Sequence, residues 1–304
     1  MPDQVEHNGP QRIPIRLAGE PGVRYGAESL TFGVPFAEGA FPAGTAQRSP
    51  ACVGPIEPGC KGLVFPTATR LRAVTADGRE LPLQTAVMTT WKPDLQQVKW
   101  LLADLQADPA RDGETVWLEV AGDQAERAES VDRIAVTAAD GLLTLDTGVL
   151  RLTLRTDFPR WQKRQWDSPV VGCAVRTADG GWRETLQGPG LLLYMKDQHG
   201  QLYTSLGVCP APKVVIEEQG PLRVCVLITG YLMSDLGLRF CPYRLRIHLY
   251  AGKADLRLYH TFIFDQDPTR IQLAAIGLKV CARPGDGALA AVGGAAEQGA
   301  SARE

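Results

Sequence analysis

Short runs of alternating apolar residues, rich in β-branched and aromatic side chains, follow one another along most of the chain. Examples are Leu222–Tyr231, Tyr243–Tyr250 and Asp255–Phe264. Period-two alternation of this kind is typical of β-strands that bury one face in a core. We find no amphipathic helical pattern of three turns between these runs. The sequence therefore predicts an all-β protein.

Asp-Gly pairs separate several of the predicted strands. They occur at Asp77-Gly78, Asp112-Gly113, Asp140-Gly141 and Asp179-Gly180. Asp-Gly accepts a positive φ at low cost and so favours the tight turns of β-hairpins. Short strands with repeated turn signals are typical of antiparallel barrels and sandwiches.

One polar segment divides the chain. Residues 121–130 read AGDQAERAES and hold no large apolar side chain, so we expect a linker there. This predicts one β domain over residues 11–120 and a second over residues 131–282. Residues 283–304 are rich in Ala and Gly and lack aromatic side chains, so we expect a disordered tail.

Composition narrows the class of protein. The formal net charge is -2, which gives no general attraction to nucleic acid or to an anionic membrane. No apolar run reaches 18 residues, and the N-terminus lacks the pattern of a secretory signal. The 7 cysteines are an odd number without CxxC spacing. We expect reduced thiols in a cytoplasmic protein, with Cys225 and Cys241 as small buried side chains and a Cys52–Cys60 disulfide as an open alternative.

The strands on either side of Gly252 are expected to form a hairpin, in which strand parity sorts the side chains onto two faces. One face carries Leu245, Ile247, Leu258 and His260, and we expect His260 to be a neutral, hydrogen-bonded core residue with a pKa lowered by burial. The other face, which we call the arginine–tyrosine face, carries Arg244, Arg246, His248, Tyr250, Arg257 and Tyr259.

The arginine–tyrosine face has three possible roles. Guanidinium groups bind carboxylates through two parallel hydrogen bonds, and tyrosine rings offer flat apolar contact with a polar tip. The face could bind an acidic sugar, or it could receive another domain, which we favour over direct sugar contact. It could also be a solvated sheet face whose arginines pair with Asp255.

A second basic and aromatic cluster lies in the segment RTDFPRWQKRQW. Its candidates for stacking on a glycan are Trp161, Trp166, Lys163 and Arg164. Tryptophans that cap the edge of a sandwich are the alternative. Nucleophile-elbow, phosphate-loop and zinc-site motifs are missing, and the 4 histidines are scattered. We therefore expect no metal, no cofactor and no catalytic residue in this chain.

Six segments in this order resemble the exo-acting rhamnogalacturonan lyase family of polysaccharide lyases. They are RIPIRLAGEPGVRYGAESLTFGVPFAEGAF, LRAVTADGRELPLQTAVMTTW, VKWLLADLQAD, LDTGVLRLTLRTD, EEQGPLRVCVLITGY and YRLRIHLYAGKADLRLYHTFIFDQDP. The resemblance covers about residues 11–281 and departs at Gln97, where serine is the expected residue. It implies an N-terminal RIFT-type β barrel followed by an antiparallel β sandwich.

The resemblance also implies a C-terminal α/α toroid, which in the family builds much of the catalytic cleft. This sequence has its Ala/Gly-rich tail at that point. We therefore expect the β portion of a lyase for acidic, pectin-type polysaccharide, inactive alone, with a helical toroid encoded downstream as a further partner. A free-standing carbohydrate-binding protein and a structural β protein are the alternatives, because a fold does not determine a function.

Overall fold

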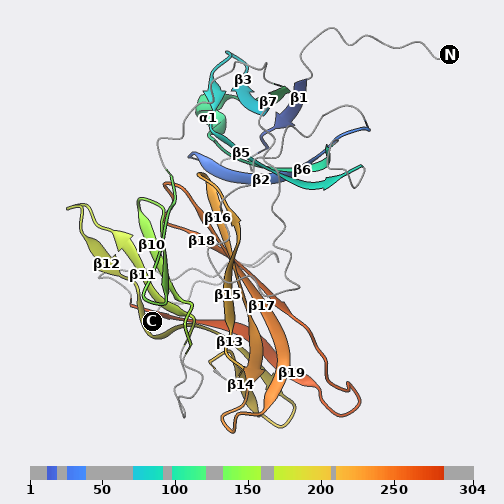
Figure 1. Ribbon diagram of the computed structural model, residues 1–304, viewed down its shortest axis with the longest axis vertical. Helices are drawn as coiled ribbons and strands as arrows, with labels where there is room; N and C mark the ends of the chain where they lie inside the picture. Colours follow the sequence, from blue (N-terminus) through green and yellow to red (C-terminus); the bar gives the residue numbers. More distant parts are fainter. Residues whose placement is uncertain are drawn as a thin grey trace, which may run out of the picture.

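The computed structural model describes residues 12–18, 26–38, 71–91, 98–120, 133–158, 168–206 and 210–283. Within these ranges the regular structure is almost entirely β-strand, as predicted, and the paired strands run antiparallel. Figure 1 shows a smaller unit of N-terminal strands above a larger unit formed by the rest of the chain. No helix in the described ranges is long and apolar enough to cross a membrane.

The N-terminal unit is a half-barrel of two small sheets. Their strand orders are β1-β7-β3-β4 and β2-β6-β5. The strands are β1 (Arg12–Arg16), β2 (Glu28–Pro35), β3 (Leu71–Thr75), β4 (Glu80–Leu81), β5 (Leu83–Thr90), β6 (Val98–Ala107) and β7 (Thr115–Val120). Leu101, Leu105 and Leu118 are buried between the sheets and form the centre of one core. The RIFT-type barrel stays a prediction.

Two larger sheets form the second unit. The first has the order β12-β11-β10-β9-β8, and the second has the order β18-β17-β16-β14-β13-β19 with β15 also paired to β16. The strands of the first are β8 (Ala135–Ala139), β9 (Leu142–Asp146), β10 (Leu150–Arg155), β11 (Val170–Arg176) and β12 (Trp182–Glu184). Those of the second are β13 (Leu186–Asp197), β14 (Leu202–Thr204), β15 (Lys213–Gln219), β16 (Arg223–Met233), β17 (Arg239–Tyr250), β18 (Leu256–Phe262) and β19 (Leu273–Ala282).

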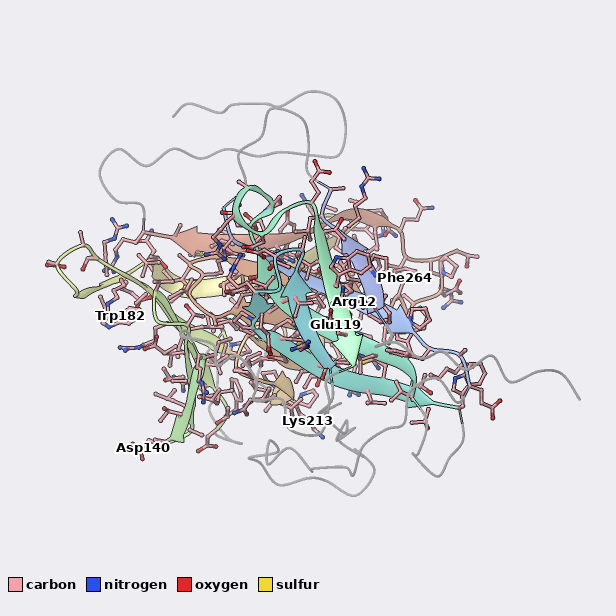
Figure 2. All side chains as sticks on the ribbon, turned by 90° about the horizontal axis from the view of Figure 1, so that it is seen from above. Arg12, Glu119, Asp140, Trp182, Lys213 and Phe264 are labelled. Carbon is pink, nitrogen blue, oxygen red and sulfur yellow. The ribbon has the colours of Figure 1, made fainter. Side chains whose placement is uncertain are left out.

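Three of the Asp-Gly pairs form turns between neighbouring strands. Asp140 and Gly141 both have positive φ, at 51° and 73°, and they alone join β8 to β9. Asp140 is labelled in Figure 2. This is the geometry of a two-residue hairpin turn. Gly78 and Gly180 also have positive φ, at 84° and 85°.

The prediction of a hairpin turn at Asp112-Gly113 is wrong. Asp112 ends the short helix α1 (Pro109–Asp112), and Gly113 follows it with a φ of 82°. The Asp112 carboxylate accepts a hydrogen bond of 2.8 Å from the backbone N–H of Asp108 and pairs with Arg79. Arg111 Nε also donates to this carboxylate at 2.9 Å. Burial raises the pKa of Asp112, but the hydrogen bonds from Arg111, Asp108 and Arg79 outweigh it and lower the pKa to about 2.

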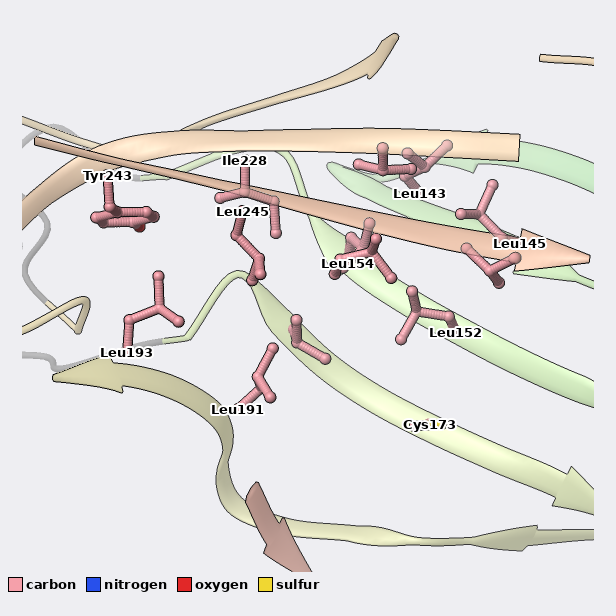
Figure 3. Packing of buried hydrophobic residues seen from close by; sticks show 14 of the residues in the cluster. Leu143, Leu145, Leu152, Leu154, Cys173, Leu191, Leu193, Ile228, Tyr243 and Leu245 are labelled. Atoms are coloured by element: carbon pink, nitrogen blue, oxygen red, sulfur yellow. The ribbon is translucent and has the colours of Figure 1, made fainter. Parts of the chain in front are cut away.

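The core of the second unit lies between its two sheets. Figure 3 shows leucines of β9 and β10 facing Leu191, Leu193, Ile228, Tyr243 and Leu245 of the larger sheet. Full burial of one such side chain contributes about 1.5–3 kcal/mol, so this cluster is a main source of stability. Cys225 and Cys241 are free thiols, 1% and 0% exposed, as predicted.

Some predictions fall outside the described residues. These are the linker 121–130, the tail from residue 284 onward, Cys52 and Cys60, and the cluster of Trp161, Lys163, Arg164 and Trp166. The predicted strand Leu81–Met88 is interrupted at Pro82, which has no N–H for a sheet ladder. The short strand β12 was not predicted.

Candidate functional site

The register of the β17–β18 hairpin confirms which residues share a face. Arg244 lies opposite Thr261, Arg246 opposite Tyr259, and His248 opposite Arg257. The intervening pairs, such as Leu245 with His260, belong to the opposite face, which packs on the core. The arginine–tyrosine face is therefore one continuous surface on the outer side of the seven-stranded sheet.

Arg246 is held by a carboxylate of the neighbouring part of the sheet. Its Nε and Nη2 donate to the two oxygens of Glu217 at 2.6 and 2.8 Å, and both side chains are about one-third exposed. The hydrogen bonds from Arg246 lower the pKa of Glu217, against burial. The expected alternative partner, Asp255, forms no ion pair with the described residues.

A β-bulge explains why Glu218 reaches the same face as Glu217. The register between β15 and β16 shifts between Ile216 and Glu218, which leaves Glu217 as the extra residue. A bulge breaks the alternation of side chains between faces. Two consecutive carboxylates therefore point to the arginine–tyrosine face, and Glu218 contacts Arg223 there.

Arg223 is the centre of a buried polar cluster that the sequence analysis missed. The residue is 1% exposed. Its Nε donates to Asp104 Oδ1 at 2.6 Å, its Nη2 donates to Glu218, and its Nη1 lies 3.0 Å from His248 Nδ1. Burial raises the pKa of Glu218, although Arg223 acts against this. A charged residue within the apolar run LRVCVLITGY was the available signal, because buried charges need partners.

His248 is neutral at pH 7. Burial, and then the positive charge of Arg223, lower its pKa to about 4. Its Nδ1 faces Arg223, and its Nε2 lies 3.6 Å from Cys225 Sγ. The ring also meets Tyr259 edge-to-face, with 5.1 Å between ring centroids. Both ring nitrogens thus face protein groups.

Cys225 and His248 do not form a reactive pair. Burial and the nearby Glu217 raise the pKa of the Cys225 thiol to about 12. A nucleophilic cysteine requires a lowered pKa and access to solvent, and Cys225 is 1% exposed. The thiol and the imidazole are therefore both uncharged and structural.

The end of the arginine–tyrosine face nearest the hairpin turn is covered by the N-terminal unit. Tyr250 is 3% exposed, and the guanidinium of Arg257 lies 4.7 Å from its ring centroid. Arg257 Nη2 also donates to the backbone oxygen of Ser29 at 2.9 Å. The docking partner at this end is therefore the chain's own N-terminal unit, where we had expected a further domain.

The covering surface is a row of polar side chains on the outer face of the sheet β2-β6-β5, which we call the polar row. It consists of Ser29, Gln84, Asp104 and Gln106. Gln84 Oε1 accepts from the backbone N–H groups of Leu222 and Arg223, both at 2.9 Å. Gln106 Nε2 donates to the oxygen of Ala251 at 2.7 Å. The polar row thus satisfies the backbone at the ends of β16 and β17.

The other end of the face is open. Arg244 is exposed, and Tyr259 is 55% exposed. Val215 lies on the same side of the sheet, with Leu227 between it and Arg246, and is 49% exposed. This open end, defined by Arg244, Arg246, Tyr259 and Val215, offers guanidinium groups beside flat apolar surface.

His260 lies on the core-facing side, as the alternation predicts, but it is only half-buried. Burial lowers its pKa. Its Nε2 has no hydrogen-bond partner among the described residues. The prediction of a hydrogen-bonded histidine is therefore wrong for this atom. The residues that the structure describes also contain no cluster of side chains able to hold a metal ion.

Comparison with known proteins supports one part of the resemblance. No curated protein matches the chain. One protein family matches residues 196–286, a segment that runs from the end of β13 through β19 and includes the whole arginine–tyrosine face. Residues 196–286 are similar to the family described as the PcRGLX-like protein central beta sandwich domain, which supports a rhamnogalacturonan lyase-like β portion.

Proposed function

We propose that this chain is the β portion of a rhamnogalacturonan lyase-like protein that holds acidic, pectin-type polysaccharide without cleaving it alone. The observation that carries this proposal is the position of the family match, residues 196–286, over the entire arginine–tyrosine face. The open end supplies the chemistry, because guanidinium groups bind uronate carboxylates and a tyrosine ring packs on the apolar face of a sugar.

The geometry favours binding over catalysis. β-Elimination from a uronate needs a neutralised carboxylate, a base for the proton at C5 and an acid for the leaving oxygen. On this face the imidazole of His248 points both nitrogens at protein groups, and Tyr250 is buried under Arg257. Arg246 is already paired with Glu217. Arg244 and Tyr259 are the groups that a polysaccharide can reach directly.

Docking of a helical domain is the second candidate function of the open end. The half-exposed Val215 and Tyr259 beside arginine side chains support it, because aromatic residues and arginine are enriched in protein interfaces. A separately supplied toroid domain would cover the same residues. Sugar binding and domain docking would then compete.

Isothermal titration calorimetry with a rhamnogalacturonan oligosaccharide tests the proposal. We expect Arg244→Gln and Tyr259→Ala each to weaken binding by about tenfold, which corresponds to about 1.4 kcal/mol. Arg270→Gln is the matched control, since Arg270 is 83% exposed and lies elsewhere. A galactan without carboxylates should bind poorly. Equal binding of both polymers, or wild-type affinity in both variants, would exclude this face as the sugar site.

An assay for unsaturated uronate products tests the second half of the proposal. The chain alone should give no increase in absorbance at saturating oligosaccharide. Formation of unsaturated product that survives Arg244→Gln would show that catalysis occurs in this chain and at another site.

A further inference from the structure

β19 lies at one edge of the seven-stranded sheet and, within the described ranges, pairs with β13 alone. The strand is 10 residues long. Its outer edge is therefore a row of backbone N–H and C=O groups that none of the described strands pairs. Such an edge is a template for a further strand, and proteins commonly protect their edges by short strands, charged side chains, prolines or bulges.

The other edge strands of the second unit carry this protection. β8 and β12 have only 5 and 3 residues. β15 places Lys213, Glu217 and Glu218 within 7 residues. β18 is held against the N-terminal unit through Arg257, which donates to the backbone of Ser29. β19 reads LAAIGLKVCA, with one charge and no proline. It is therefore the least protected of these edges.

Apolar side chains of β19 are exposed on the core-facing side of the sheet. Ile276 lies opposite Met195, and Val280 lies opposite Leu191. These partners on β13 are buried, whereas Ile276 is 41% exposed and Val280 is 49% exposed. The core-facing side of β19 thus extends beyond the cover that β13 receives. A strand added at this edge would place a neighbour beside both side chains.

A tyrosine lies across β19 on the outer side of the sheet. Tyr194 belongs to β13 and pairs with Gly277. A Cβ built on Gly277 would lie 2.6 Å from the Tyr194 hydroxyl oxygen and 2.7 Å from two ring carbons. The hydroxyl end of the ring therefore lies over Gly277 and points towards the free edge. Lys279, two positions further along β19, projects from the same outer side.

We propose that two copies of this chain pair through β19, edge to edge and antiparallel, with Leu278 on the two-fold axis. In this register Ile276 lies opposite Val280 of the second copy, so the exposed apolar side chains cover each other. Each copy contributes the same surface, as a two-fold interface requires. The seven-stranded sheets of both copies then continue into one another.

The charges favour this register over its neighbours. Gly277 lies opposite Lys279 of the second copy, which places the ammonium group beside the ring of Tyr194, a cation–π arrangement. A two-fold axis at Lys279 would instead set two lysines directly opposite each other, which is unfavourable. An axis at Gly277 would pair Val280 with the small side chain of Ala274.

Sedimentation equilibrium of the full chain over a range of concentrations tests the pairing. One added strand buries less surface than the about 1,200–2,000 Å² of stable interfaces, so the mass should rise with concentration from 32.9 kDa towards twice that value. Val280→Lys should raise the dissociation constant about tenfold or more, because it sets a charge opposite Ile276. Val171→Lys is the matched control, since Val171 is 42% exposed and lies on β11 of the other sheet. A monomer at every concentration up to about 200 µM, which would place the dissociation constant in the millimolar range, would overturn the inference. So would equal effects of the two variants.

A designed disulfide tests the register. Ala275 would lie opposite Cys281 of the second copy, and opposite residues of antiparallel strands lie within reach of a disulfide. Within one copy the two positions are about 20 Å apart along the strand, so they cannot bond to each other. Ala275→Cys treated with copper phenanthroline should give a covalent dimer whose 275–281 bond is found by mass spectrometry, and adding Cys281→Ser should abolish it. A covalent dimer that persists with Cys281→Ser, or a noncovalent dimer that never forms this bond, would overturn the proposed interface. Neither experiment involves polysaccharide, so the result is independent of the proposed function.

Discussion

Arg223 and Arg246 lie on the same sheet face and each pairs with a glutamate of one bulge, yet their environments are opposite. Arg223 is 1% exposed and bridges Glu218 of its own unit to Asp104 of the N-terminal unit. Arg246 is 33% exposed, and its partner Glu217 is a neighbour in the same sheet. At the covered end of the face, an arginine therefore links the two units through buried ion pairs. At the open end, an arginine in a similar pair stays accessible to solvent.

From this difference we infer that burial, more than the number of hydrogen bonds, sets what the loss of one partner costs. Both arginines make two short contacts with carboxylates. A buried charge that loses its partner retains the full desolvation cost, whereas water replaces a lost partner at the surface. Substitutions along this face should therefore have effects that fall steeply from the covered end to the open end.

The largest expected effect is that of Arg223→Met. This change leaves Asp104 buried without its cation and should lower the free energy of unfolding by about 3–5 kcal/mol, measured by urea denaturation. The double variant Arg223→Met with Asp104→Leu should recover most of this loss, because an apolar pair replaces the buried charges. A double variant as unstable as Arg223→Met alone would contradict the idea that the Arg223–Asp104 ion pair holds the two units together.

Gly220→Ala tests the close approach of the two units. A Cβ at Gly220 would overlap the amide group of Gln84, which three backbone hydrogen bonds hold in place. We expect a loss of about 1–3 kcal/mol, as for other overpacked sites. Adding Gln84→Ala should remove the overlap, so that the two losses are less than additive. Strict additivity would mean that the contact is absent in solution.

The pH dependence of stability tests the environment of His248. Its pKa in the folded protein is lowered to about 4 from 6.5, so the unfolded chain takes up the proton first as the pH falls. Its contribution is complete above pH 6.5 and is lost as the pH falls towards 4. Because the ring is half-buried, we expect a loss of about 1–2 kcal/mol, less than the full shift implies. In His248→Gln, the free energy of unfolding from urea denaturation should change less between pH 6.5 and pH 4 than in the wild type. Glu218, whose pKa is raised, acts in the opposite direction, but it does so equally in both proteins.

The smallest expected effect is that of Arg246→Ala. The pair with Glu217 is partly exposed, and such pairs contribute about 0–1 kcal/mol. The thermal melt should therefore be nearly unchanged. The affinity for an acidic oligosaccharide should still fall, because Glu217 loses its cation and then repels the ligand carboxylates. Loss of stability comparable to that of Arg223→Met would erase the contrast between the two ends of the face.

The residues of the arginine–tyrosine face were predictable because they depend on local geometry. A strand alternates its side chains, and a hairpin with a short turn carries this alternation from Tyr250 to Arg257, as the register shows. The same reasoning placed His260 on the core-facing side and Cys225 in a buried strand. It failed for Asp112-Gly113, because a distant arginine, Arg79, captures the Asp112 carboxylate.

The sequence by itself determined the all-β fold, the strand faces and the resemblance of the hairpin region to a lyase sandwich. Only the tertiary structure decided which end of the face is covered and which is open. Gln84 and Asp104 lie more than 100 residues before Arg223, with separations of 139 and 119 residues, and alternation says nothing about which surfaces meet at that distance. The sequence also gave no sign of the ion pairs that Arg12 and Arg72 form with Glu119. Their strands β1, β7 and β3 become neighbours only when the small sheet assembles.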